Sequence, residues 1–237
     1  MNNNLRASLV CTAFIMAGCA DNKPSPPTEK MVQSATVKAD NQSQLLIQGW
    51  YDLETSTTRP SDTQLRYITP GDTTKTAALK TFQFIAMTLA GGGQVQSFSK
   101  DQLKGHEVSG LINPSLDWLT PRVSAIFKAE MEKLPVKNYE APIVIKPLVW
   151  KLTYKNLAGG DDNYQFAMLT TLSRLGKDKE GKERYKAIEC SAQKVDVREY
   201  TLPEWQANNY EKVTKISQEI MDNCLKKLAD EANSFLF

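Results

Sequence analysis

The chain has 237 residues, of which 41% are hydrophobic, so it can fill the core of one large domain or two small ones. Its 29 Lys and Arg residues nearly balance its 27 Asp and Glu residues, which leaves a formal net charge of +2. So small a charge provides no strong field for a polyanion, and we expect no nucleic-acid partner.

The first residues have the three parts of an export signal. Arg6 and the initiating amine supply positive charge, Leu9 to Ala17 form a short apolar segment, and small residues follow. This segment is well short of the ~20 residues that span a bilayer. We therefore interpret residues 1–18 as a signal peptide.

The segment ends in Met16-Ala-Gly-Cys19, which resembles the lipobox of bacterial lipoproteins, with Met16 where the family pattern has Leu. The resemblance implies cleavage before Cys19, lipidation of its thiol and anchoring by acyl chains. Because Ala20 rather than Asp follows the cysteine, it also implies the outer membrane, facing the periplasm. Cleavage after Ala20 is the alternative and would leave a soluble periplasmic or secreted protein.

Residues 19–44 are expected to form a lipidated flexible tether. Pro24, Pro26 and Pro27 stand among polar residues there, and the segment has little apolar surface to bury. Residues 45–237 are then expected to form a single periplasmic domain.

The first half of this domain gives weaker patterns. We expect a strand over Leu45 to Leu53 and a short apolar piece over Leu65 to Thr69. A helix capped by Asp72 or Thr73 is expected to run to about Ala90, with residues 77–90 apolar on nearly every face, and the glycines that follow would end it. Ser99 to Gly110 is expected to be loop-like or partly helical.

A second helix is expected from Ser115 to Leu134, because apolar residues recur there at three- and four-residue steps. Its apolar face would consist of Leu116, Leu119, Val123, Ile126 and Phe127.

The C-terminal half gives the clearest pattern, an antiparallel three-strand meander over Ile143 to Leu157, Tyr164 to Leu175 and Arg184 to Val195. In the first of these strands, alternation predicts one buried face and one solvent-exposed face. The buried face would hold Leu148, Trp150, Leu152 and Tyr154, and the exposed face Lys151, Thr153 and Lys155.

The final helix opens with the capping-box pattern Thr201-Leu-Pro-Glu204 and continues toward Asn233. Its inward stripe is predicted to be Val213, Ile216, Ile220, Cys224 and Leu228. These elements predict an α+β domain, with an antiparallel sheet made of the meander and an N-terminal strand, packed against two or three helices.

Two cysteines remain after export and lipidation, Cys190 in the third meander strand and Cys224 on the stripe of the last helix. Packing the helix on the sheet would bring them together, so we expect a disulfide in an oxidising periplasm. Two separately buried thiols are the alternative.

The sequence shows no catalytic, metal or cofactor motif. His106 is the one histidine, so a two-histidine zinc site is excluded, and no Gly-x-Ser-x-Gly elbow accompanies it. We expect a surface or loop histidine and a protein that is not an enzyme.

The expected role is that of a non-catalytic accessory or assembly factor, which works through protein contacts in the cell envelope with a partner that the sequence does not identify. The aromatic residues best able to anchor such contacts are Trp50, Tyr51, Trp118, Trp150 and Trp205. One alternative is a lipid- or small-ligand-binding module whose pocket is lined by residues 82–89. The other is a hydrolase with His106 as its base.

Overall fold

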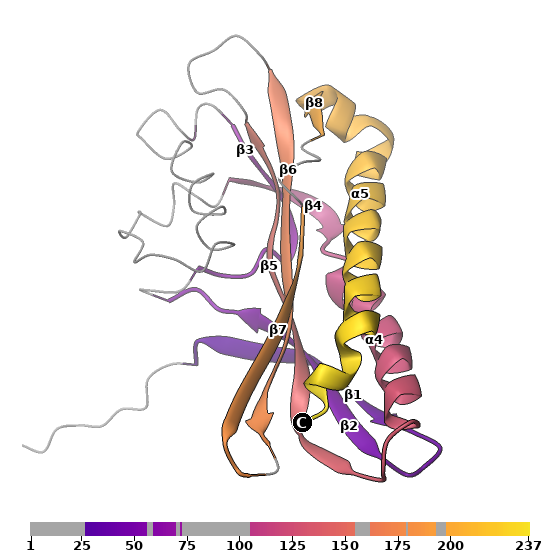
Figure 1. Ribbon diagram of the computed structural model, residues 1–237. Helices are drawn as coiled ribbons and strands as arrows, with labels where there is room; N and C mark the ends of the chain where they lie inside the picture. The colour runs from indigo at the N-terminus through magenta and orange to yellow at the C-terminus, as the bar shows by residue number, and fades with distance from the viewer. Residues whose placement is uncertain are drawn as a thin grey trace, which may run out of the picture.

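The computed structural model describes residues 27–55, 59–69, 72, 105–154, 162–178, 180–192 and 198–237. The strands are β1 (Glu29–Lys38), β2 (Gln44–Asp52), β3 (Gln64–Ile68), β4 (His106–Ile112), β5 (Asn138–Tyr154), β6 (Asn163–Lys177), β7 (Glu183–Ser191) and β8 (Glu199–Thr201). The helices are α4 (Ser115–Met131), α5 (Leu202–Glu231) and the short 3-10 helix η1 (Ala232–Phe235). Figure 1 shows α4 and α5 lying on the same face of the sheet.

The long hairpin of β5 and β6 forms the centre of a mixed sheet. The meander β5–β6–β7 is antiparallel, as expected. On its other edge β5 pairs with two strands in turn, β2 beside Asn138–Ile145 and β3 beside Lys151–Thr153, and both pairings are parallel. The prediction of a purely antiparallel sheet is therefore wrong. The reason is that long connections containing α4 and other elements separate β2 and β3 from β5, and such connections permit parallel crossovers.

The ordered fold begins earlier than residue 45. Strand β1 pairs antiparallel with β2 along its length, and Val37 and Ala39 are buried in the core. The turn after it is fixed because the Asn41 amide donates to the carbonyls of Met131 and Leu134, at 2.8 and 3.0 Å. The expectation of a flexible tether is therefore wrong for residues 29–44. The signal peptide and Cys19 lie outside the described residues.

The segment before α4 also differs from expectation. Residues 106–110 belong to strand β4, which pairs antiparallel with β3, so the loop-like or helical prediction is wrong there. Gly105, just before this strand, has a φ of +61°, a conformation that favours glycine. The apolar helix expected up to Ala90 lies outside the described residues beyond Asp72.

The core lies between the sheet and the two helices. The predicted helix α4 is confirmed, with Leu119, Val123 and Phe127 fully buried. The capping box of Thr201 and Glu204 at the start of α5 is also present. Both helices therefore begin where the sequence patterns place them.

Helix α5 is broken near its start by four residues with non-helical backbone, Ala207 to Tyr210. Beyond the break its buried stripe consists of Val213, Ser217, Met221, Cys224, Leu225 and Leu228. The predicted stripe is thus right for Val213, Cys224 and Leu228. Ile216 and Ile220 are only partly buried, because they lie at the border of the contact with the sheet.

Candidate functional site

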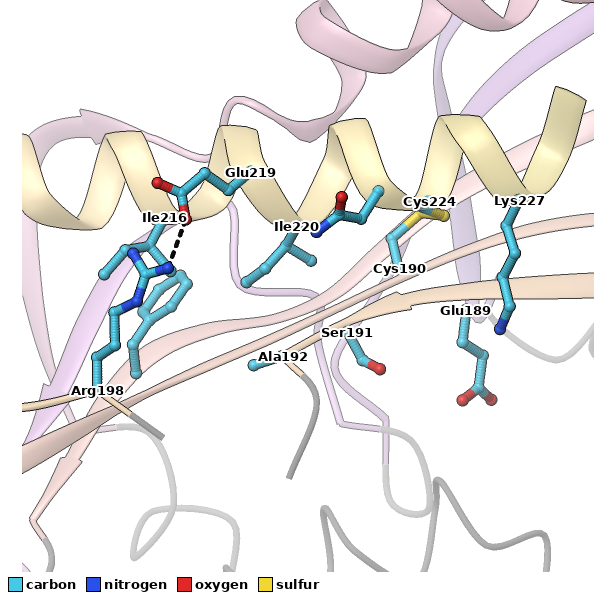
Figure 2. A pocket seen from close by; sticks show the side chains of 12 residues that line it. Glu189, Cys190, Ser191, Ala192, Arg198, Ile216, Glu219, Ile220, Cys224 and Lys227 are labelled. Carbon is cyan, nitrogen blue, oxygen red and sulfur yellow. Dashed lines mark hydrogen bonds and ion pairs between the residues drawn. A yellow bond between two sulfur atoms is a disulfide. The ribbon is translucent and has the colours of Figure 1, made fainter. Parts of the chain in front are cut away.

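A groove runs between α5 and the end of β7, and Figure 2 shows it from close by. Its volume is about 260 Å³. The helix contributes Ile216, Glu219, Ile220, Asn223 and Lys227 to its lining, and β7 with the residue after it contributes Glu189, Cys190, Ser191 and Ala192. Cys224 of the helix, Phe166 of β6 and Arg198 complete it.

The helical repeat explains why apolar side chains face this groove. Ile216 and Ile220 are one helical turn apart, so they lie on the same side of α5, and both point toward the strands in Figure 2. They are partly buried although the sequence placed them in the core. The groove therefore exposes part of two isoleucines, because the hydrophobic face of α5 is wider than its contact with the sheet.

A disulfide between Cys190 and Cys224 joins the two walls, as predicted. The Cα atoms are 5.1 Å apart and both residues are buried. The bond connects β7 to α5 at one place along the groove, so it fixes the separation of the walls there. This arrangement holds the shape of the groove before anything binds to it.

Charged side chains surround the two isoleucines. Arg198 and Glu219 form an ion pair of 2.6 Å across the groove. Glu189 and Lys227 are both exposed and point toward the same end in Figure 2. Within the described part of the chain neither of these two belongs to an ion pair. The rim thus offers one anionic and one cationic group to a partner.

A second cluster of charges is buried where β5 parts from β2 and joins β3. Asp62 accepts a hydrogen bond from the Trp150 amide (3.0 Å), and its side chain is only 4% exposed. Lys151, whose side chain is 0% exposed, lies 3.2 Å from the same carboxylate, and Arg59 lies equally close. Burial raises the pKa of Asp62 to about 6, although Arg59 and Arg66 act in the opposite direction.

The sequence patterns did not predict this cluster and placed Lys151 and Thr153 on a solvent-exposed face. Both are buried, so that prediction is wrong. Lys155, the third residue of that face, lies outside the described residues. The predicted buried face is right for Trp150 and Leu152, which face the helices. It is wrong for Leu148, which is only partly buried and packs with Val149 in a separate cluster, because the pairing of β5 with β6 shifts register between Pro147 and Val149. What the pattern did not reveal is that Asp62 supplies a partner for the lysine. We interpret the cluster as a structural junction because its carboxylate replaces a missing strand partner for β5.

His106 lies on β4 and its side chain is 52% exposed. Its Nε2 is 3.2 Å from Oδ2 of Asp72, and its ring stacks on Tyr67 with a centroid distance of 5.1 Å. The hydroxyl that accompanies this pair belongs to Thr69, which donates to the Asp72 carboxylate rather than to the histidine. Among the described residues no serine contacts the His106 ring, so the arrangement is not a nucleophile–histidine–acid triad there.

The candidate interface aromatics divide into two groups. Trp150 and Trp205 are buried, and their indole N–H groups donate to Ser217 and to the Tyr164 carbonyl, so they are core residues. Trp50, Tyr51 and Trp118 are partly exposed. None of the five lines the groove.

Two further searches of the described ranges gave negative results. No group of three or more His, Cys, Asp or Glu side chains there is placed to hold a metal ion. No helix there combines the length and the apolarity that crossing a bilayer requires.

Comparison with known proteins adds no residues to this site. No protein-family model matches the chain, and neither a curated protein nor a solved structure is significantly similar to it. The chemistry of the groove therefore rests on its own residues.

Proposed function

We propose that this chain is a lipid-anchored lipoprotein of the bacterial cell envelope that acts as a non-catalytic accessory or assembly factor. The observation that carries the proposal is the groove between α5 and β7, which places the partly exposed Ile216 and Ile220 among charged side chains and is held by a disulfide. Such a surface suits contact with another protein, whose apolar side chains enter while polar groups meet the rim.

The groove suits a protein partner better than a small apolar ligand. Its volume of about 260 Å³ lies below the ~300 to 1,000 Å³ of pockets that enclose drug-sized molecules. A lipid or other small ligand would also have to share it with Arg198 and Glu219. We therefore keep the ligand-binding role as the alternative that experiment must exclude.

The membrane anchor is supported by the lipobox-like Met16 to Cys19 and by a disulfide that suits an oxidising compartment. Because β1 begins at Glu29, only residues 19–28 would link the acyl chains to the sheet. Ten residues reach at most about 35 Å and average about 18 Å as a flexible coil. The domain would therefore stay close to the outer membrane.

Amine-reactive crosslinking in the native envelope, followed by mass spectrometry, tests the proposal. We expect one defined complex, with crosslinks from Lys227 at the groove exceeding those from Lys133, an exposed lysine just after α4 that pairs with Glu130. The Cys19→Ser variant should lose the complex because it lacks the anchor. No defined complex, together with a copurified small ligand, would contradict the accessory role.

A further inference from the structure

We infer that the back face of the sheet, meaning the side that points away from α4 and α5, lies against the lipid surface to which the chain is anchored. This inference rests on the proposed function and names the surface that the domain presents to the membrane. Three features of the described residues carry it: the apolar side chains of this face, the pairing of its charges, and the place where the chain reaches the sheet.

Alternation places a continuous row of side chains on the back face. Leu45 and Ile47 of β2 are buried in the core beneath the helices. The residues that alternate with them therefore point to the back face, where each is partly exposed. The register continues this row across the sheet, because β2 pairs with β5, β5 with β6 and β6 with β7. The large apolar residues of the back face in this part of the sheet are Met31, Leu46, Trp50, Val144, Leu175 and Tyr185.

Three of these side chains are exposed. The exposed fraction is 46% for Met31, 60% for Leu175 and 68% for Tyr185. Leu175 and Tyr185 are direct partners in the register of β6 and β7, so they form one apolar pair near the end of that hairpin. Tyr185 and the partly exposed Trp50 combine an apolar ring with one polar group, as residues at a lipid–water boundary do. The face thus has the side chains of an interfacial surface.

The charges nearest to the start of β1 are paired. The Nζ atom of Lys146 lies 2.6 Å from a carboxylate oxygen of Glu29 and 3.0 Å from one of Asp52. At the end of the hairpin, Lys177 is opposite Glu183 in the register. Paired charges lose less on leaving water than single ones, and the lysine shields both carboxylates from anionic headgroups. This part of the face can therefore approach a phospholipid surface.

The chain reaches the sheet on this same face. Strand β1 begins at Glu29, which pairs with Lys146, and Figure 1 shows the start of β1 on the side of the sheet away from the helices. Lys146 is opposite Thr171 of β6, and Leu175 lies four residues further along that strand, so it is about 15 Å from the attachment point. Residues 19–28 span about 18 Å on average as a flexible coil. So short a tether brings the back face, rather than the helices, toward the bilayer.

The arrangement also leaves the groove free. Helix α5 and its groove belong to the other side of the sheet, so a domain whose back face rests on lipid turns the groove toward the periplasm. A protein partner can reach it there. The anchor and the partner thereby use different faces of the domain.

Fluorescence quenching on vesicles tests the inference. The purified full-length lipoprotein is inserted by its acyl chains into vesicles of phosphatidylethanolamine and phosphatidylglycerol that carry a headgroup-linked quencher. Because Cys19 is acylated and the other two cysteines of the mature chain form the disulfide, an introduced cysteine is the one free thiol for a fluorescent probe. Ser34→Cys places the probe on the back face, and Lys226→Cys places it on the exposed side of α5. We expect quenching to be at least about threefold stronger at position 34.

Charge placed on the back face should abolish this difference. The double variant Leu175→Glu, Tyr185→Glu should reduce quenching of the probe at position 34 to the level of the control position. Val136→Glu changes an equally exposed apolar residue in the loop after α4, outside the sheet, and should leave the quenching unchanged. Met31→Glu is an independent variant on β1 and should give the same loss if the double variant does not fold.

Three results would overturn the inference. One is equal or weaker quenching at position 34, and another is quenching there that none of the back-face variants lowers. The third is concentration-dependent pairing of two probes at position 34 without quenching by lipid, which would assign the face to a second copy of the chain. All three leave the accessory role standing. Protein that does not float with the vesicles would refute the anchor itself, and with it the proposed function.

Discussion

The disulfide between Cys190 and Cys224 should make a large contribution to stability. The two cysteines are 34 residues apart in the sequence. Closing a loop of that length lowers the conformational entropy of the unfolded chain, which raises the free energy of unfolding by about 4 kcal/mol at 25 °C. Reduction of the wild-type protein removes the bond without changing any side chain. We therefore expect the reduced protein to lose about 4 kcal/mol of unfolding free energy.

Equilibrium unfolding in urea, followed by the fluorescence of the buried Trp150 and Trp205, measures this loss. With an m-value of about 2 kcal/mol/M the midpoint should fall by about 2 M. The double variant Cys190→Ala, Cys224→Ala should behave like the reduced wild type and should not respond to reductant. A difference below about 1 kcal/mol between oxidised and reduced protein would refute the view that this bond clamps β7 to α5.

Three further predictions concern single residues. The raised pKa of Asp62 means that the folded state binds a proton more tightly than the unfolded state, so this group stabilises the fold below about pH 4 and loses that effect as pH rises through about 6. Urea titrations should therefore show Asp62→Asn to be more destabilising at pH 4 than at pH 7, and the opposite trend would mean that its ion pairs dominate. Gly105→Ala should lower the free energy of unfolding by more than about 2 kcal/mol, because the φ of this residue is +61° and the added Cβ would lie 2.5 Å from the Tyr67 carbonyl oxygen. An unchanged urea midpoint would contradict this. Asn209 has a φ of +54°, so Asn209→Gly should raise the unfolding free energy by up to about 1 kcal/mol, and a loss of stability would show that its side chain matters more than its backbone.

Periodicity predicted the parts of the fold where one buried face alternates with one exposed face. The meander, α4 and the start of α5 follow from such patterns. Strand β1 was missed because the prolines just before it dominate the composition, while its own alternation toward Val37 uses small and polar residues. Strand direction was not predictable, because periodicity is the same in parallel and antiparallel strands.

The candidate site was only partly visible in the sequence. Cys190 and Cys224 were paired correctly because each lies on an inward face. Ile216 and Ile220 were placed in the core, since the sequence shows that a residue is apolar but not where a neighbouring strand ends. Lys151 and Asp62 are far apart in the chain, and a charged residue taken alone is predicted to be exposed.

The intact mass of the mature protein, purified from the membranes of its native host, tests the central claim most directly. The proposed anchor predicts a chain that begins at Cys19 and carries acyl chains on that residue. A mature chain that begins at residue 21 without attached lipid would contradict both the anchor and the envelope role inferred from it.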